Sequence, residues 1–596
     1  MEKNMEEPLS SQREMTHQHT TPKHSKGGLI TMPFIIANEA FEKVASYGLI
    51  PNMILYLMRD YSVGVAKGTS ILFLWTAGTN FMPILGALIS DSYLGRFLTI
   101  GLGSISSLLG MILLWLTAMV PKVRPPPCDI TTQSCKTPTT GQMTLLLSSF
   151  ALMSIGAGGV RPCSIAFGAD QLDNKSNPKN ERVLESFFGW YYASAAISVL
   201  ISLTAIVYIQ DHLGWKLGFG VPAILMFLSA LLFFFASPFY VKQKPSKSLF
   251  TGFIQVPVVA YKNRKLAFPP RDSDGWYHHK RDSKFIAPTT KLRFLNKACI
   301  IRNPEQIASD GSASNPWSLC TIEQVEELKA LLKVIPLWST GIMISINISQ
   351  STFQLLQASS MDRHISSSFQ IPAGSFGMFT IISLATWVIL YDRAILPLAS
   401  KIKGKPVQLG AKLRMGIGLF LSCMAMVVSA IVESIRRRKA IREGYLNNAH
   451  AVLNMSAMWL VPQHCLNGLA EAFNAIGQTE FYYSEFPKSM SSIAAALFGL
   501  GMAVANLLAS AILSAVDKLT SRGGKESWVS DNINKGHYDN YYWLLAIMSS
   551  VNLLYFLVCS WAYGPCVERV IKVSDEGNGF KEEALSNISA IVKDEV

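Results

Sequence analysis

Long apolar blocks recur along this chain, and they constrain its fold more than any other feature. Of its 596 residues, 49% are hydrophobic and only 16% are charged, whereas soluble domains are about a quarter charged. A helix needs about 20 mostly apolar residues to cross a bilayer. Runs of this kind occur at residues 31–57, 68–90, 98–120, 142–168, 187–209, 217–241, 328–357, 375–398, 412–435, 454–482, 489–516 and 541–564. We therefore expect an all-α membrane protein with twelve transmembrane helices.

A long polar stretch separates the sixth run from the seventh, so the helices divide into two sets of six. Two six-helix bundles around a central substrate site are typical of the major facilitator fold. The expected parts are a cytosolic N-terminal tail (1–28), an N-terminal bundle (29–241), a cytosolic central loop with an amphipathic helix (242–327), a C-terminal bundle (328–565) and a cytosolic C-terminal tail (566–596). Thr321, followed by Ile-Glu-Gln, predicts a helix that starts in the cytosol and continues into the seventh span.

The net charge of +13 lies mostly in loops, where it indicates topology and contact with anionic lipid rather than nucleic-acid binding. Basic loops on one side place both termini in the cytosol. One segment conflicts with this orientation, because "RRRKAIREG" (436–444) follows the ninth span and would have to face outward.

The first span contains "NEAFEKVASYG", with Glu39, Glu42 and Lys43. Spacings of three and four residues place these charges along one helical face, and Glu39 with Lys43 is the favourable i,i+4 order. A buried carboxylate beside a cation is an arrangement that proton coupling requires. The alternative is that all three side chains extend from the helix end to the lipid headgroups.

Arg161 precedes Pro162 within "GGVRPC" in the fourth span. A proline inside a helix predicts a distorted backbone, and a cation in the membrane is expected to face the protein interior. Arg161 is thus a candidate for binding an anionic solute. A purely structural ion pair with a carboxylate on another span is the alternative.

Several motifs resemble the proton-dependent oligopeptide transporters, and within them the plant nitrate/peptide transporter family, with the low-affinity nitrate transporter branch nearest. They are the ExxEK of the first span, "GALISDSYLGRF" (86–97), "GAGGVRPCSIAFGADQLD" (156–173), "EFPKSMSS" (485–492) and "NKGHYDNYYW" (534–543). The resemblance covers nearly the whole chain. It implies that Glu39, Glu42 and Lys43 form the proton-coupling cluster.

The same resemblance implies that Arg161 lines the central cavity and that Glu471 acts in gating. The chain also departs from the family. Ser46 replaces one of two tyrosines that follow the motif in peptide carriers, which counts against a peptide substrate. In the seventh span Ile348 occupies the position of a nitrate-binding histidine, which leaves Gln350 as a nearby polar candidate for substrate contact or simple packing.

These observations predict a proton-coupled symporter of a small anion, with low-affinity nitrate transport across the plasma membrane by alternating access as the first hypothesis. A plant hormone or another small organic acid (gibberellin, abscisic acid, jasmonate) is the alternative substrate, and a transport-linked sensor is an alternative role. The sequence has no repeated filter segment of the kind that would indicate a channel. It also has no HExxH, GxSxG or P-loop motif of the kind that would indicate an enzyme. We expect no cofactor, no metal and no catalytic residue.

Two smaller features remain. Thr99 lies three residues after Arg96, so it is either a candidate phosphorylation site for a basophilic kinase or a structural helix-start residue. Cys128 and Cys135 bracket a loop expected outside, where they form either a disulfide or two free thiols. Nothing in the sequence sets an oligomeric state.

Overall fold

The structure is a computed structural model of the whole chain. It describes residues 27–126, 136–173, 180–243, 250–269, 276–279, 287–303, 306–308, 311–367, 369–404, 409–487 and 490–564. Cys128 and Cys135, which either form a disulfide or remain free thiols, lie outside these residues.

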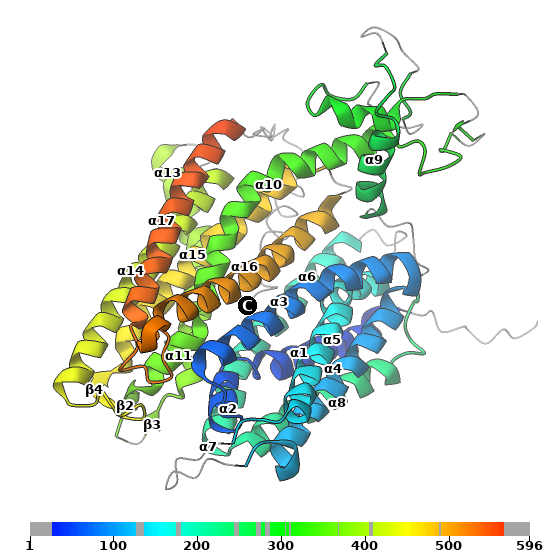
Figure 1. Cartoon of the computed structure of the whole chain (residues 1–596). Helices are drawn as coiled ribbons and strands as arrows, with labels where there is room; N and C mark the ends of the chain where they lie inside the picture. The colour runs from blue at the N-terminus through cyan, green and yellow to red at the C-terminus, as the bar shows by residue number, and fades with distance from the viewer. Residues whose placement is uncertain are drawn as a thin grey trace, which may run out of the picture.

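The first half of the chain forms one helical bundle, coloured blue to teal in Figure 1. Its elements are η1 (Leu29–Thr31), α1 (Met32–Tyr47), α2 (Met53–Arg59), α3 (Val65–Ile89), η2 (Ser90–Leu94), α4 (Arg96–Met119), η3 (Pro121–Val123), α5 (Thr140–Leu172), α6 (Asn180–Ile201), η4 (Ser202–Ile206), α7 (Val207–His212) and α8 (Trp215–Phe235). We call it the N-bundle.

A central segment contains α9 (Phe250–Lys262) and η5 (Arg293–Cys299), and the second bundle follows it. The elements of this C-bundle are α10 (Ile322–Ile348), α11 (Ser351–Ser359), β1 (Met361–Asp362), β2 (His364–Ser366), β3 (Phe369–Gln370), η7 (Ala373–Gly377), α12 (Met378–Leu390), η8 (Tyr391–Ile395), α13 (Leu396–Lys403), α14 (Ala411–Arg442), β4 (Leu453–Ser456), η9 (Ala457–Leu460), α15 (Val461–Glu485), α16 (Ser491–Thr520), η11 (Arg522–Gly524) and α17 (Tyr538–Tyr563). β1 pairs with β4 in parallel, and β2 pairs with β3 antiparallel.

Within the described residues, ten helices are long and apolar enough to cross a membrane. The other two of the twelve expected spans differ for identifiable reasons. The first is interrupted, because α1 ends at Tyr47 and the chain continues into α2 only after a turn. The tenth, α15, buries polar side chains along its length: Gln463, His464, Asn467, Asn474 and Gln478. Both helices pack within their bundles, so the chain has the twelve-helix, two-bundle architecture of the major facilitator fold.

The start of α10 follows from its sequence. The hydroxyl of Thr321 accepts from the backbone N–H of Gln324, and the side chain of Gln324 accepts from the backbone N–H of Thr321. This reciprocal capping box satisfies two backbone donors at the helix end. The helix begins in the central segment and continues into the seventh span. Buried apolar side chains of α9 and η5, with Cys299 and Cys320, pack against its first turns.

The first part of the basic segment after the ninth span is helix rather than loop, which accounts for two of its five basic residues. α14 continues to Arg442, so Arg436 and Arg437 lie on its last turns. Arg436 is completely buried and pairs with Glu433 at 2.7 Å. Arg437 donates to the carbonyl of Gly536. These two charges are bound inside the protein and do not report which side of the membrane the segment faces.

Close contacts between α3, α4 and α5 depend on glycine. Gly86 of α3 lies against the carbonyl of Gly158 in α5, so closely that a Cβ at position 86 would overlap this oxygen. Pro162 has no N–H to offer the carbonyl four residues earlier, which is that of Gly158. α5 is nevertheless one helix from Thr140 to Leu172, so Pro162 does not end it.

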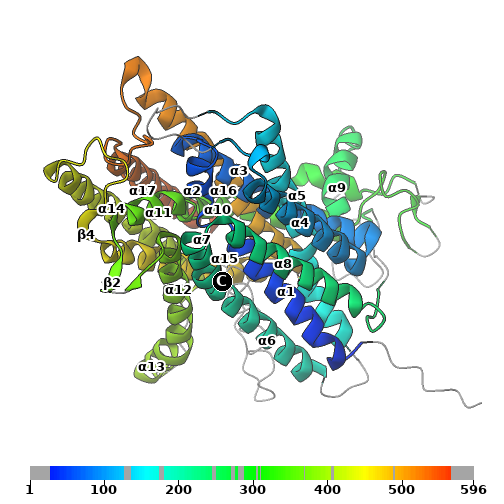
Figure 2. The ribbon, with the colours of Figure 1, turned by 90° about the horizontal axis from the view of Figure 1, so that it is seen from below.

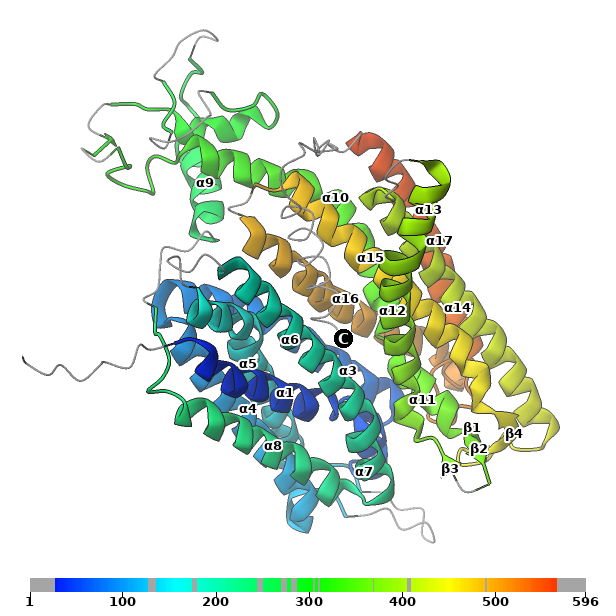
Figure 3. The same cartoon turned by 180° about the vertical axis from the view of Figure 1, so that it is seen from behind.

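The two bundles meet along α3 and α16, which lie side by side in Figures 1 and 3. Ala196 of α6 also joins an apolar cluster with residues of α12 and α15. We call the end of the bundles that carries β1–β4 the distal end; it lies opposite α9 (Figure 1). Figure 2, seen from below, shows α7, α11 and α2 close together at this end.

Replacing Gly86 by Ala should destabilise the N-bundle by about 1–3 kcal/mol or prevent folding, because the new methyl group meets backbone that cannot move aside. Fluorescence-detected gel filtration and thermal unfolding of the detergent-solubilised protein measure this effect. Gly141→Ala is the control, since its Cβ would point into open space. A Gly86→Ala protein as stable as the control would show that the α3–α5 packing is wrong.

Candidate functional site

The charged face of α1 lies inside the N-bundle. Glu39, Glu42 and Lys43 are 1%, 0% and 4% exposed, and α1 packs against α6 and α8. Asn38 fixes the helix to α8, because its amide donates to the hydroxyl of Ser229 (2.8 Å) and that hydroxyl donates to the Asn38 carbonyl (2.8 Å). The three charges therefore face protein and not lipid tails.

The two carboxylates of α1 have different partners. Lys43 Nζ lies 3.5 Å from Glu39 Oε1, in the i,i+4 pair that the sequence predicted. Glu42 Oε1 accepts a hydrogen bond from the Ser46 hydroxyl at 2.7 Å. Its other oxygen, Oε2, is buried and has no hydrogen-bond partner in the part of the chain that the structure describes. A buried carboxylate oxygen without a donor is costly while the group is charged.

Tyr47 joins this face to α5. Lys43 Nζ lies 5.8 Å from the centre of the Tyr47 ring, and the Arg161 guanidinium carbon lies 5.3 Å from it. Both cations are within the range of a cation–π interaction. The ring thus brings the fourth-helix arginine next to the α1 charges. We refer to Glu39, Glu42, Lys43, Tyr47 and Arg161 as the α1–α5 cluster.

The sequence pointed to four members of the α1–α5 cluster but not to the role of Tyr47. One signal was available, since Tyr47 lies four residues after Lys43 and therefore on the same helical face. In the sequence, Ser46 was notable only because it replaces a tyrosine that the peptide carriers have at this position. In the structure its hydroxyl serves as the donor to Glu42.

The other predicted residues lie on other elements. Glu471 is half-buried near the middle of α15, in the C-bundle. Gln350 is fully buried between α10 and α11, where it donates to the Ile346 carbonyl (2.7 Å) and accepts from the Tyr541 hydroxyl (3.1 Å). Both hydrogen-bond partners belong to the C-bundle, and the choice between substrate contact and packing for Gln350 stays a prediction.

Thr99 is 5% exposed, and its hydroxyl donates to the carbonyl of Gly95 at 2.9 Å. This is a structural role at the start of α4, and it leaves the hydroxyl inaccessible to a kinase in this conformation. The neighbouring Arg96 pairs with Asp170 of α5 at 2.5 Å, which joins the two helices at the end opposite the distal one.

Comparison with known proteins gives consistent matches over most of the chain. A family model described as the POT family matches residues 97–529. Protein NRT1/PTR FAMILY 1.2 of Arabidopsis thaliana is 66% identical over 603 residues, covering 98% of this chain and 99% of that protein. Protein NRT1/PTR FAMILY 1.1 of the same plant is 64% identical over 586 residues, covering 97% and 99%.

Solved structures with the same fold are also transporters. The crystal structure of an auto inhibited POT family peptide transporter superposes with a TM-score of 0.66 at 19% identity, and the match covers 91% of this chain and 98% of that one. The in meso crystal structure of the POT family transporter PepTSo gives 0.64 at 16% identity, covering 90% and 98%. At these identities the likeness shows the fold alone.

Replacing Lys43 by Met should destabilise the protein by about 3–5 kcal/mol, because it leaves the Glu39 carboxylate buried without its cation. The double variant Glu39→Gln/Lys43→Met removes both charges and should recover most of the lost stability. Thermal unfolding of both proteins in lipid nanodiscs at neutral pH provides the comparison. If the single variant is as stable as the double variant, Glu39 and Lys43 do not form a buried pair.

Proposed function

The chain belongs to the POT family and is a transporter rather than an enzyme, and we propose that it is a proton-coupled symporter of a small anion. Nitrate is the substrate that we propose first, carried with low affinity across the plasma membrane by alternating access. The termini and the central segment face the cytosol, so the distal end of the bundles faces outside.

The α1–α5 cluster is the observation that supports this function most. Its two carboxylates and two cations give a formal charge of zero when all four groups are ionised. An anion that binds at Arg161 brings this buried cluster to a net charge of −1, which is unfavourable in a low-dielectric site. Taking up one proton restores neutrality. Anion binding and protonation therefore favour each other, which is the thermodynamic requirement for symport.

Glu42 is the residue that we propose takes up this proton. Its Oε2 atom is buried without a donor in the described structure, whereas Oε1 already accepts from Ser46. Protonation at Oε2 removes the buried charge and leaves the Ser46 contact in place. Glu39 then serves mainly as the counter-ion of Lys43.

The membrane potential gives the proton a second role. Moving one elementary charge across the membrane is worth about 2.3 kcal/mol per 100 mV. An inside-negative potential opposes the entry of a lone monovalent anion by this amount. One proton per anion makes transport electroneutral, and two protons make it electrically driven.

Arg161 is the residue that we propose binds the anion. Its planar guanidinium can donate two parallel hydrogen bonds to an oxyanion, and its contact with Tyr47 fixes its position. Carboxylates of small organic acids offer the same geometry, so plant hormones are the alternative substrates. Glu471, half-buried on the facing bundle, is the carboxylate that we propose alternates with the anion as a partner for Arg161.

Replacing Glu42 by Gln should abolish the stimulation of nitrate uptake by acid, because glutamine keeps an acceptor for Ser46 but cannot titrate. Uptake is measured in a heterologous cell at acid and neutral external pH, with nitrate and a panel of organic acids. Glu443→Gln, on the distal surface, is the matched control. Normal acid stimulation in Glu42→Gln, with surface expression equal to that of the control, would exclude Glu42 as the coupling group.

Replacing Arg161 by Met should reduce uptake at least about tenfold at every pH, because it removes the charge-assisted contacts to the anion. Arg161→Lys keeps the charge and should retain partial uptake with a raised KM, since it loses the planar donor pair. Concentration-dependent uptake separates these effects. An Arg161→Met protein with the wild-type KM would place the anion elsewhere.

A further inference from the structure

The segment between α16 and α17 reaches across the distal end from one bundle to the other. Asp531 lies in this segment, and its Oδ1 accepts a hydrogen bond from the backbone N–H of Val65 at 2.6 Å. Val65 is the first residue of α3 in the N-bundle, and its N-cap Gly64 offers no side-chain oxygen. A carboxylate from the C-bundle thus caps a helix of the N-bundle, where the positive end of the helix dipole favours it.

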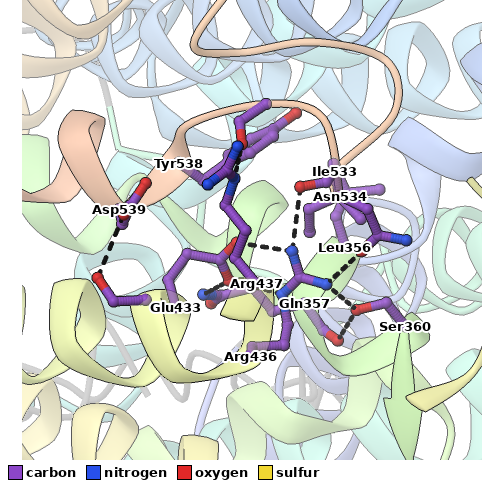
Figure 4. Close-up of polar contacts among 12 residues, drawn as sticks. Leu356, Gln357, Ser360, Glu433, Arg436, Arg437, Ile533, Asn534, Tyr538 and Asp539 are labelled. Carbon is purple, nitrogen blue, oxygen red and sulfur yellow. Dashed lines mark hydrogen bonds and ion pairs between the residues drawn. The ribbon is translucent and has the colours of Figure 1, made fainter. Parts of the chain in front are cut away.

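The same segment is held to its own bundle by Arg436. All five N–H groups of this guanidinium have acceptors. Nε and Nη2 donate to the two oxygens of Glu433, each at 2.7 Å. Nη2 also donates to the Ile533 carbonyl (3.0 Å), and Nη1 donates to Asn534 Oδ1 (2.7 Å) and Ser360 Oγ (3.3 Å). Figure 4 shows Arg436 between the α14 carboxylate and the backbone of the segment.

Further contacts extend this arrangement through the C-bundle. Gln357 of α11 donates to Glu433 Oε2 at 2.8 Å, and its own carbonyl oxygen accepts from the Tyr542 hydroxyl of α17 at 3.3 Å. Asn534 donates to the carbonyls of Tyr445 and Asn448 in the loop after α14. The Glu433–Arg436 pair is therefore fully buried and well satisfied, which is the condition under which such a pair holds its partners firmly.

The two ends of the segment differ greatly in strength. Toward the C-bundle, the fully buried Arg436 donates to the Ile533 carbonyl and to Asn534 Oδ1 of the segment, and the Asn534 amide donates to the carbonyls of Tyr445 and Asn448. Toward the N-bundle, the carboxylate of an exposed residue accepts the hydrogen bond from Val65. If the bundles separate at the distal end, the contact between Asp531 and α3 gives way first, and the segment stays with the C-bundle.

We propose that Asp531 is a latch of the outer gate, and that Arg436 is a positioning residue that holds the latch in place. The inference rests on the proposed transport by alternating access, in which the distal end must open to load substrate from outside. Other polar contacts between described residues also join the bundles at this end: Arg363 with Asp211 (3.6 Å), the Ser375 hydroxyl with the Leu203 carbonyl (2.8 Å), and the Ser70 hydroxyl with the Ser514 hydroxyl (3.4 Å). Together with these contacts, Asp531 holds the two bundles closed at the distal end.

The latch can be broken from either bundle. Asp531→Ala removes the acceptor. Gly64→Ala places a Cβ 2.9 Å from Asp531 Oδ1, while the backbone of Gly64 (φ −61°) suits an alanine. Glu526→Ala is the control in the same segment, because this carboxylate accepts from Ser530 within the segment.

Spin labels at Lys122→Cys and Ala449→Cys report the distance between the two bundles at the distal end. Both positions are exposed there. In a background with the native cysteines replaced, pulsed electron paramagnetic resonance in nanodiscs gives the closed and open populations. Asp531→Ala and Gly64→Ala should each lower the closed-to-open ratio roughly 2- to 10-fold, the size of effect expected for an exposed carboxylate at a helix N-terminus. Glu526→Ala should not change it.

A second label pair, Lys525→Cys with Ala449→Cys, tests the role of Arg436 by reporting how firmly the segment is held to the C-bundle. Asp531→Ala should leave this distance distribution unchanged. Glu433→Met/Arg436→Met should broaden it, and it should also lower the closed-to-open ratio that the first label pair reports. The double variant is used because it leaves no buried charge behind.

Closed and open populations equal to those of the wild type in both Asp531→Ala and Gly64→Ala would overturn the proposal that Asp531 is a latch. An unchanged second distance in the double variant would overturn the role of Arg436. Neither measurement depends on which anion is carried or on proton coupling, so failure of the proposed function would appear separately, in the uptake assays.

Discussion

The burial of charge in a helix that the membrane cannot solvate is the constraint on which the rest of this structure depends. A charged side chain at the bilayer centre costs at least about 2.5–3.5 kcal/mol unless it finds a partner. α1 carries three such side chains, and each faces protein. The Asn38–Ser229 bonds hold α1 against α8, and α6 packs against α1 as well. Tyr47 then links the α1 charges to the half-buried Arg161, and we propose that this one cluster serves both fold and transport.

Much of this arrangement could be predicted from the sequence, because span length and local charge spacing are properties of short segments. The twelve apolar runs, the Glu39–Lys43 pair and the helix start at Thr321 are of this kind. The features that could not be predicted are side chains whose contact partners lie far away in the sequence. The basic run after the ninth span resembled a loop, yet Arg436 is buried by Ser360 and Asn534, which lie 76 and 98 residues away. The contact of Gln350 with Tyr541, 191 residues away, could not be predicted for the same reason.

Buried polar groups divide into two classes in this molecule. The Glu433–Arg436 pair has all five guanidinium donors satisfied, and it holds one segment of the distal end in place. In the α1–α5 cluster, Glu42 keeps one oxygen without a donor among the described residues. The first arrangement is suited to rigidity, and the second is suited to a change of protonation. An alternating-access transporter needs both, because its bundles move as rigid bodies around a site whose charge changes.

The central claim is that Glu42 carries a proton when the anion is bound. Infrared difference spectroscopy of the protein in lipid bilayers, recorded on adding nitrate at acid pH, observes the carboxyl group directly. The account predicts that a protonated carboxyl C=O band appears with the anion and is missing when position 42 is glutamine. A spectrum with no carboxyl band on nitrate binding, or one with the same band in both proteins, would contradict it.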